Sequence, residues 1–282
     1  MIKYTITQFN KDFPNDDTCL EWLKNYLYPN GIFCKQCGVV TKHHKVKSRQ
    51  AYACDRCGKH VYPMTETIFE KSTTPLKLWF YSIFLIASTR CGISAKQIQR
   101  ETGVTYKTAW RMAHEIRSLL QEDCNPMSGE VEIDETYIGS RKPGKRGRGA
   151  EGKTTVFGIA QRKGNITALI TPDIKSSTLY PVIKKYVLPD SMIYTDEFQA
   201  YRSLKKHGYN HKRVHHASKV FVQGNAHTNT IEGFWSVLKR GIDGVYHAVS
   251  QKHLQGYINE YSFRYNHRGD DKPMFKTILE RV

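Results

Sequence analysis

Four cysteines restrict the fold of this chain more than any other feature of its sequence. They form the pattern C-x2-C-x16-C-x2-C, and a glycine follows each pair. Two tight turns with this spacing can present four thiolates to one tetrahedral Zn²⁺ ion. A segment this short buries too little apolar surface to fold alone, so metal binding would supply its folding free energy, roughly 10 kcal/mol or more. We therefore predict a structural zinc ribbon with the ligands Cys34, Cys37, Cys54 and Cys57.

Four thiolates complete the coordination of the ion and leave no open position for a substrate. Two coincidental pairs, or a redox dithiol, are the alternative interpretation, which the regular spacing disfavours. The other three cysteines, Cys19, Cys91 and Cys124, are scattered. A secreted disulfide framework would not show this pattern, so we expect a reducing compartment.

The charge of the chain is strongly positive. Lys and Arg number 43 against 26 Asp and Glu, a formal net charge of +17 over 282 residues. Such an excess favours a polyanionic partner, nucleic acid before an anionic membrane. The longest apolar run, 78–87, is about half the length that spans a bilayer, and the amino terminus lacks the apolar core of a signal peptide. We therefore expect a cytoplasmic protein with no membrane partner.

The pattern of apolar residues changes from helical to strand-like near residue 125. Before that point we predict an amino-terminal helix, the zinc ribbon and three further helices. After it, three strands, a helix with Pro181 in its first turn, and then a further strand and helix predict an α/β fold with a mixed sheet. The expected domains are 1–72 (amino-terminal helix and zinc ribbon), 73–124 (helix-turn-helix) and 125–282 (the sheet domain).

Two crossed helices joined by a turn at Gly103 are predicted within the second domain. Ile93, Ile98 and Val104 would be buried between them. The start of the second helix is polar and basic, and there a recognition helix meets the base edges of DNA. A helical hairpin without a ligand is the alternative, against which the net charge argues. The candidate DNA contacts are Tyr106, Lys107, Thr108 and Arg111.

Three acids are candidates for a divalent-cation site. Asp134 lies on a predicted strand, Asp196 ends another, and Glu232 lies near the start of a helix predicted within 227–242. Carboxylate oxygens are the ligands that Mg²⁺ and Mn²⁺ prefer, and strands hold such ligands rigidly. Two ions about 4 Å apart could activate the attacking oxygen and stabilise the leaving oxygen at a phosphodiester. Each aspartate taken alone would be an ordinary strand-end or turn residue.

Other residues near these acids suggest contacts with a substrate. Lys239 follows Glu232 by seven residues, about two helical turns, and would reach a substrate phosphate. A solvated pair of charges is the alternative. Trp235 is predicted in the core or stacked on a DNA end, and His215 or His216 could touch phosphates.

The stretch 141–153 is too rich in Gly and Arg to pack, so we predict a solvated loop in the free protein that orders on DNA phosphates. Its candidate DNA contacts are Arg141, Lys142, Lys145, Arg146 and Arg148.

Taken together, these motifs resemble those of bacterial insertion-sequence transposases of the DDE superfamily, in the group with a zinc ribbon, a helix-turn-helix and an RNase H-like catalytic domain. The resemblance covers nearly the whole chain. It rests on the stretches CKQCG…CDRCG, EIDETYIG, YTDEFQAY, HTNTIEGFWSVLKRGI and YINEYSFRYNHR.

The resemblance implies that Asp134, Asp196 and Glu232 form a catalytic triad with Mg²⁺ or Mn²⁺, and that Lys239 is the family's basic residue two turns after the glutamate. It also implies hydrolysis at transposon ends, followed by attack of the freed 3′-hydroxyl on target DNA. We expect double-stranded DNA as partner and a homodimer or larger complex on paired inverted repeats. A DNA-binding regulator without catalysis, and a structure-specific nuclease or resolvase, are the alternative functions.

Overall fold

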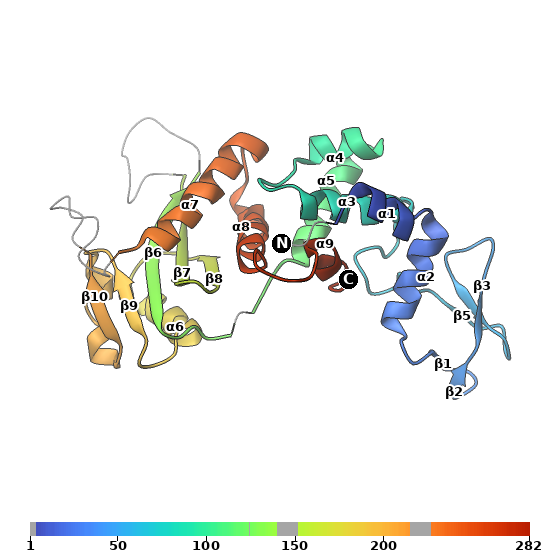
Figure 1. Ribbon diagram of the computed structural model, residues 1–282, viewed down its shortest axis with the longest axis horizontal. Coiled ribbons are helices and arrows are strands. Elements are labelled where there is room, and N and C mark those ends of the chain that lie inside the picture. The colour runs from blue at the N-terminus through green and yellow to red at the C-terminus, as the bar shows by residue number, and fades with distance from the viewer. Residues whose placement is uncertain (1–3, 124, 140–151, 215–226) are drawn as a thin grey trace. The chain divides into compact units, whose positions relative to one another are not determined.

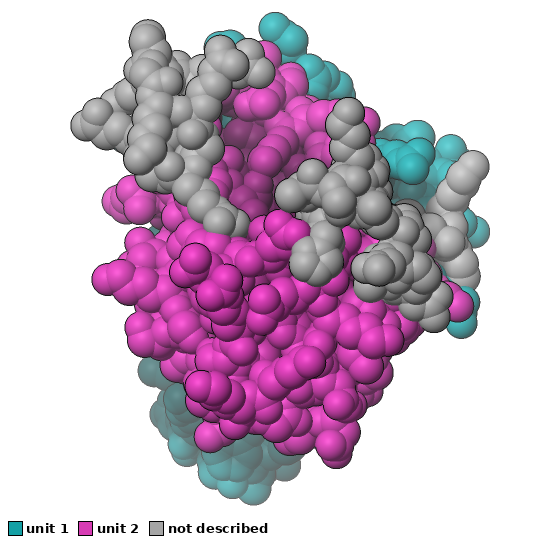
Figure 2. All heavy atoms as spheres, turned by 90° about the vertical axis from the view of Figure 1, so that its left-hand side faces the viewer, with its two compact units in different colours: residues 1–119, 270–282 teal, residues 120–269 magenta. Residues whose placement is uncertain are grey.

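The computed structural model describes residues 4–123, 125–139, 152–214 and 227–282 (Figure 1). Their contacts form two compact units (Figure 2). Unit 1 comprises residues 1–119 and 270–282, and unit 2 comprises residues 120–269. The division into three domains stays a prediction, while the contacts group the carboxyl-terminal segment with the amino-terminal helices.

Unit 1 is a group of helices with a segment of short strands. The helices are α1 (Ile6–Asp12), α2 (Asp16–Leu27), α3 (Leu76–Ser88), α4 (Ala95–Thr102), α5 (Tyr106–Ser118) and α9 (Met274–Leu279). Strand β1 (Ile32–Cys34) pairs with β2 (Val39–Thr41), and β3 (His43–Lys45), β4 (Tyr52–Cys54) and β5 (His60–Val61) form a second antiparallel sheet. Phe275 of α9 packs edge-on against Phe9 of α1 with the ring centroids 5.8 Å apart, so the last helix belongs to the aromatic core of the unit.

The helix pair predicted around Gly103 is present as α4 and α5. Gly103 has φ 72°, a left-handed conformation that favours glycine and ends α4. The Thr105 side chain then accepts a hydrogen bond from Thr108 N at 3.2 Å and so begins α5. Ile98 and Ala109 are fully buried, as crossed helices require.

Unit 2 contains a five-stranded mixed sheet, which confirms the predicted α/β class. Its strands are β6 (Glu130–Ile138), β7 (Thr154–Gln161), β8 (Ile166–Ile170), β9 (Met192–Thr195) and β10 (Asn210–Arg213), in the order β10-β9-β6-β7-β8. The hairpins β6-β7 and β7-β8 are antiparallel, whereas β9 is parallel to both β6 and β10. Helices α6 (Ser176–Tyr186), α7 (Asn229–Gly241) and α8 (Gln251–Asn266) cover the sheet.

The helices bury both faces of the sheet. Phe157 and Ile159 of β7 pack with α6, while the alternate residues Val156 and Ala160 pack with α7 and α8 on the other face (Figure 1). This alternation is the period of two expected of a strand. On β6, Val131 and Ile133 face α6, which leaves the even-numbered positions on the face of α7.

Helix α6 begins earlier than its proline suggested. We expected Pro181 in the first turn, which is wrong, because the helix starts at Ser176 and Pro181 lies inside it. The Asp173 side chain accepts hydrogen bonds from Lys175 N at 3.0 Å and Thr178 Oγ1 at 2.6 Å. This local turn fixes the helix start, and the proline removes only one backbone hydrogen bond of the interior.

None of the helices in the described parts of the chain is long and apolar enough to cross a bilayer.

Candidate functional site

The four predicted zinc ligands meet in unit 1. The sulfur atoms of Cys34, Cys37, Cys54 and Cys57 all lie within 4.8 Å of one another. Each pair forms a tight turn in which the following glycine donates back to the first cysteine, Gly38 N to Cys34 O and Gly58 N to Cys54 O, both at 2.9 Å. Both glycines have positive φ angles, 70° and 72°, which explains why glycine follows each pair.

The electrostatics of the cluster fit a bound cation. Hydrogen bonding with Cys57 is the main reason that the pKa of Cys37 is raised to about 12, whereas the Thr41 hydroxyl is the main reason that the pKa of Cys54 is lowered to about 6. Four thiols at this distance cannot all ionise without a compensating charge. A tetrahedral set of sulfur donors suits Zn²⁺, which would stabilise all four thiolates.

Asp134 lies in the middle of β6, on the face covered by α7. Burial is the main reason that its pKa is raised to about 7, and the neighbouring Glu135 and Asp196 act in the same direction. The Trp235 indole donates its Nε1–H to Asp134 Oδ2 at 3.0 Å and opposes that shift. A divalent cation at this carboxyl would favour its ionised form.

Strand β7 leaves room for the indole at Gly158. This glycine is the direct register partner of Asp134, and a Cβ atom there would lie 2.5 Å from Trp235 Cζ2. Trp235 is 4% exposed, so it is a core residue. Its hydrogen bond to Asp134 adds a contact that neither of its predicted roles included.

Asp196 comes directly after β9. In the parallel pairing of β6 and β9, Tyr194 lies opposite Glu132, and Asp196 and Asp134 each follow this pair by two residues. The charge of Asp196 also contributes to the raised pKa of Asp134. Phe198 N donates to Asp196 Oδ1 at 2.9 Å, which orients the side chain. The structure therefore places the two predicted aspartates within electrostatic reach of each other, one on β6 and one just beyond β9.

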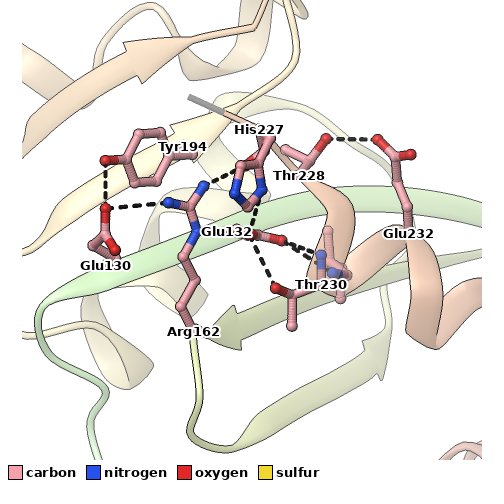
Figure 3. A network of polar contacts seen from close by, with 9 residues as sticks. Glu130, Glu132, Arg162, Tyr194, His227, Thr228, Thr230 and Glu232 are labelled. Atoms are coloured by element: carbon pink, nitrogen blue, oxygen red, sulfur yellow. Dashed lines mark hydrogen bonds and ion pairs between the residues drawn. The ribbon is translucent and has the colours of Figure 1, made fainter. Parts of the chain in front are cut away.

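Glu232 lies in the first turn of α7, which packs on the same face of the sheet. Its side chain is exposed, and the buried Thr228 donates its Oγ1–H to Glu232 Oε1 at 2.6 Å (Figure 3). Within the described ranges, only the four-cysteine group brings three or more potential ligand atoms within 4.8 Å of one another. The acids thus come from neighbouring elements without forming so compact a group.

Lys239 lies two turns after Glu232 on α7 and is exposed. Desolvation lowers the pKa of its ammonium group, and the Asp134 carboxylate partly opposes this shift. The side chain therefore lies within electrostatic reach of Asp134.

The predicted DNA contacts of α5 differ in accessibility. Tyr106 is 49% exposed and Lys107 is also exposed, whereas Thr108 is half-buried. Arg111 donates to Ser72 Oγ at 3.1 Å and lies over the Trp79 ring, so its guanidinium is engaged by neighbouring side chains of the same unit. Trp110, one turn after Tyr106 and 37% exposed, was not among the predicted contacts, although its spacing of four residues from Tyr106 places both on one side of α5.

The basic loop lies outside the described residues, together with Arg141, Lys142, Lys145, Arg146 and Arg148. His215 and His216 lie outside them as well.

Three polar residues beside the acids escaped sequence reasoning. Glu132, Arg162 and Tyr194 form a network of polar and ring contacts next to the start of α7 (Figure 3). The spacing E-x-D in EIDETYIG could have revealed the first of them, because alternate residues of a strand share a face. Nothing in the sequence links it to the other two.

Two family profiles match the chain. That of the ISXO2-like transposase domain covers residues 126–266, and that of the transposase zinc-ribbon domain covers residues 14–60.

Two curated proteins are similar to it. An uncharacterized protein in transposable element ISH50 of Halobacterium salinarum is 28% identical over 96% of this chain and 98% of that protein. An uncharacterized transposase-like protein of Haemophilus influenzae is 31% identical over 37% of this chain and 83% of its own length.

Similar solved structures include a simian T-cell lymphotropic virus intasome in complex with the PP2A regulatory subunit B56 gamma. That match has 13% identity and a TM-score of 0.33, and it covers 68% of this chain and 76% of the other. A pre-cleavage Mos1 transpososome matches with 11% identity and a TM-score of 0.31 over 72% and 75% of the two chains. Both likenesses are too distant to support an argument about this chain.

Proposed function

Since this chain belongs to the transposase family defined by the ISXO2-like domain, we propose that it cleaves DNA at the terminal inverted repeats of an insertion sequence and joins the freed ends to target DNA. The family membership gives the class of protein. The residues of unit 2 supply the argument for the chemistry.

One observation carries the catalytic proposal. Asp134 on β6 and Asp196, directly after the neighbouring parallel strand β9, each follow the register pair Glu132 and Tyr194 by two residues, and α7 with Glu232 packs on the same face of the sheet as Asp134. We infer that these three carboxylates hold Mg²⁺ or Mn²⁺, because clustered acids on rigid elements provide the oxygen ligands of such ions. When bound, the ions would activate the attacking oxygen and stabilise the leaving oxygen of the phosphodiester.

The other residues of the site have supporting roles in this proposal. Trp235 orients Asp134 through its indole hydrogen bond. Lys239, near Asp134, binds a phosphate oxygen of the DNA and holds the scissile bond. Thr228 holds the Glu232 carboxylate and would exchange this contact when the acid ligates a metal.

DNA binding is assigned to the remaining basic and aromatic elements. We propose that the ribbon, folded around Zn²⁺, and α5 with Tyr106, Lys107 and Thr108 bind the inverted repeat. The basic segment that contains Arg146 would bind DNA phosphates. The assembly would be a homodimer or larger complex on two ends, with unit 2 as the RNase H-like catalytic domain.

The test is cleavage of a duplex that carries the inverted repeats of the insertion sequence. Wild-type protein should cut it only with Mg²⁺ or Mn²⁺ and then join the cut ends to a second duplex. Asp134→Asn should lower cleavage at least 1,000-fold, because it removes an anionic ligand, while DNA binding stays within about threefold. Asp190→Asn is the matched control, since Asp190 is an exposed acid in a loop of the same unit with φ 66°, which Asn tolerates.

Each alternative function has its own result in this assay. DNA that is bound but never cut would identify a regulator without catalysis. Cutting without strand joining would identify a nuclease or resolvase. Either result would overturn the proposed transposition activity.

A further inference from the structure

Six residues form a polar cluster centred on Arg162, here called the arginine hub (Figure 3). They are Glu130, Glu132, Arg162, Tyr194, His227 and Thr230. Arg162 follows the end of β7, and its side chain is 11% exposed. Its guanidinium donates to Glu132 Oε1 at 2.8 Å, to Glu130 Oε1 at 3.1 Å and to His227 O at 2.8 Å. It also lies 4.1 Å from the centroid of the Tyr194 ring, so one side chain contacts β6, β9 and the segment before α7.

Glu132 anchors the helix that carries Glu232. Its side chain is fully buried and accepts hydrogen bonds from Thr230 N at 2.7 Å and Ile231 N at 3.1 Å. These N–H groups of the first turn have no partner within the helix, and a helix normally satisfies such groups with its own capping residue. The capping residue of α7, Thr228, makes no such hydrogen bond and contacts Glu232 instead. A carboxylate on β6 therefore replaces the missing cap from another element.

For each of the three acids, the residue two positions earlier in the chain belongs to the hub. Glu132 comes two residues before Asp134, Tyr194 two before Asp196, and Thr230 two before Glu232. On β6 this spacing returns to the same face, so Glu132 lies one pleat away from Asp134. Tyr194 lies near the end of β9, which Asp196 directly follows. On α7 the contact is in the first turn, at the backbone that precedes Glu232.

We propose that the arginine hub is a positioning device that fixes the relative placement of Asp134, Asp196 and Glu232, with Arg162 as its central positioning residue. This inference rests on the proposed function, because it concerns the three acids assigned to metal binding there. It adds residues that touch neither the metal ions nor the DNA in that proposal.

The geometry requires an arginine. Its planar guanidinium donates in three directions to acceptors on different elements while its face covers an aromatic ring. A lysine would keep the positive charge beside Glu132 but cannot reach all three acceptors at once. Arg162→Lys therefore separates the positioning role from the charge.

Arg268→Lys provides the matched control. Arg268 belongs to the same unit, lies 3.8 Å from the centroid of the Tyr265 ring and donates to backbone carbonyls of Tyr265 and Gly164. Like Arg162, it combines a ring contact with donation to a backbone carbonyl, but its acceptors and its ring lie outside the hub.

The experiment measures Mn²⁺ binding to the full-length protein by electron paramagnetic resonance, and amide hydrogen exchange by mass spectrometry. Arg162→Lys should weaken Mn²⁺ binding about tenfold, as loss of a residue that orients ligands does. It should also speed exchange at the start of α7, with the melting temperature close to that of wild type. Arg268→Lys should leave both unchanged. Unchanged Mn²⁺ affinity in Arg162→Lys would overturn the proposal, as would weakened affinity with no change of exchange at α7.

A second variant covers the case in which Arg162→Lys folds poorly. The double variant Glu132→Gln with Arg162→Gln removes both buried charges together and leaves neither without its partner. It should fold and show the same tenfold loss of Mn²⁺ affinity, and wild-type affinity in it would overturn the proposal. Failure of the proposed function is a separate result, because wild-type protein would then bind no Mn²⁺ or cut no DNA.

Discussion

His211 illustrates how single residues near the site depend on their surroundings. It lies on β10, is 6% exposed, and its Nε2 is 2.8 Å from Thr195 Oγ1. Thr195 Oγ1 donates to Asp196 O at 2.8 Å, so its oxygen can accept a hydrogen bond from His211 in the tautomer that carries the proton on Nε2. Burial is the main reason that its pKa is lowered to about 4, and the nearby Arg213 and Lys205 act in the same direction.

The lowered pKa of His211 predicts a loss of stability at mildly acidic pH. The unfolded chain takes up the proton near pH 6.5, whereas the folded chain does so only near pH 4. The stabilising contribution is therefore complete above pH 6.5 and is lost as the pH falls toward 4, about 2 kcal/mol of it between pH 7.5 and 5. The free energy of unfolding of His211→Gln, which keeps a hydrogen-bond donor, should fall correspondingly less between pH 7.5 and pH 5. Urea unfolding at these two pH values measures the difference.

The contribution of His211 is the difference between wild type and His211→Gln in the pH dependence of the free energy of unfolding, because the titration of all other groups cancels in that difference. His44→Gln, at an exposed position of β3, should behave as wild type. Equal pH dependence of wild type and His211→Gln would show that His211 is not held neutral in the folded protein.

The elements of unit 1 differ in what stabilises them. Strands β1 to β5 contain two or three residues each, and Phe33 and Val40 on the first hairpin are more than half exposed. Such strands bury too little surface to be stable by themselves. The four cysteines lie at the ends and turns of these strands, so a bound ion is the interaction that can hold them together.

Zinc removal is therefore expected to unfold the strand segment. Wild-type protein should release one Zn²⁺ per chain to a chelator, after which the amides of β2 and β4 should lose their protection from hydrogen exchange. Cys37→Ser should bind less than a tenth as much zinc, and Cys91→Ser, outside the cluster, should bind a full equivalent. Strand amides that stay protected without metal would contradict a structural role for zinc.

Elements were predictable from sequence where the signal was local. Glycines after the cysteine pairs, the turn at Gly103 and the alternation in EIDETYIG each determine structure within a few residues, and each prediction agrees with the structure. Pro181 misled the prediction because the start of α6 depends on the Asp173 side chain, whose hydrogen bonds outweigh one missing backbone donor.

The whole molecule has a net charge of +17, which favours the proposed binding of DNA. Each phosphate that the protein neutralises releases counterions, so the affinity should fall steeply with salt concentration. The basic loop contributes five of the predicted contacts, Arg141, Lys142, Lys145, Arg146 and Arg148.

Replacing these five residues with alanine should lower the slope of log Kd against log salt by up to about 4.5, at about 0.9 per phosphate contact. The measurement is a fluorescence anisotropy titration without Mg²⁺ at several salt concentrations. Asp134→Asn is the control and should keep the wild-type slope. If the slope of the alanine variant also stays unchanged, the loop makes no phosphate contacts.

The sequence by itself determined the cysteine cluster, the α/β class and the three candidate acids. These depend on local spacing and on the periodicity of strands and helices, which neighbouring residues encode. The pairing of Asp134 with Gly158 and the parallel pairing that brings β9, and Asp196 after it, beside β6 were decided only by the tertiary structure, because strand register joins residues far apart in the chain. The same holds for Arg162. Its partners come from three separate elements, and no motif around it in the sequence indicates them.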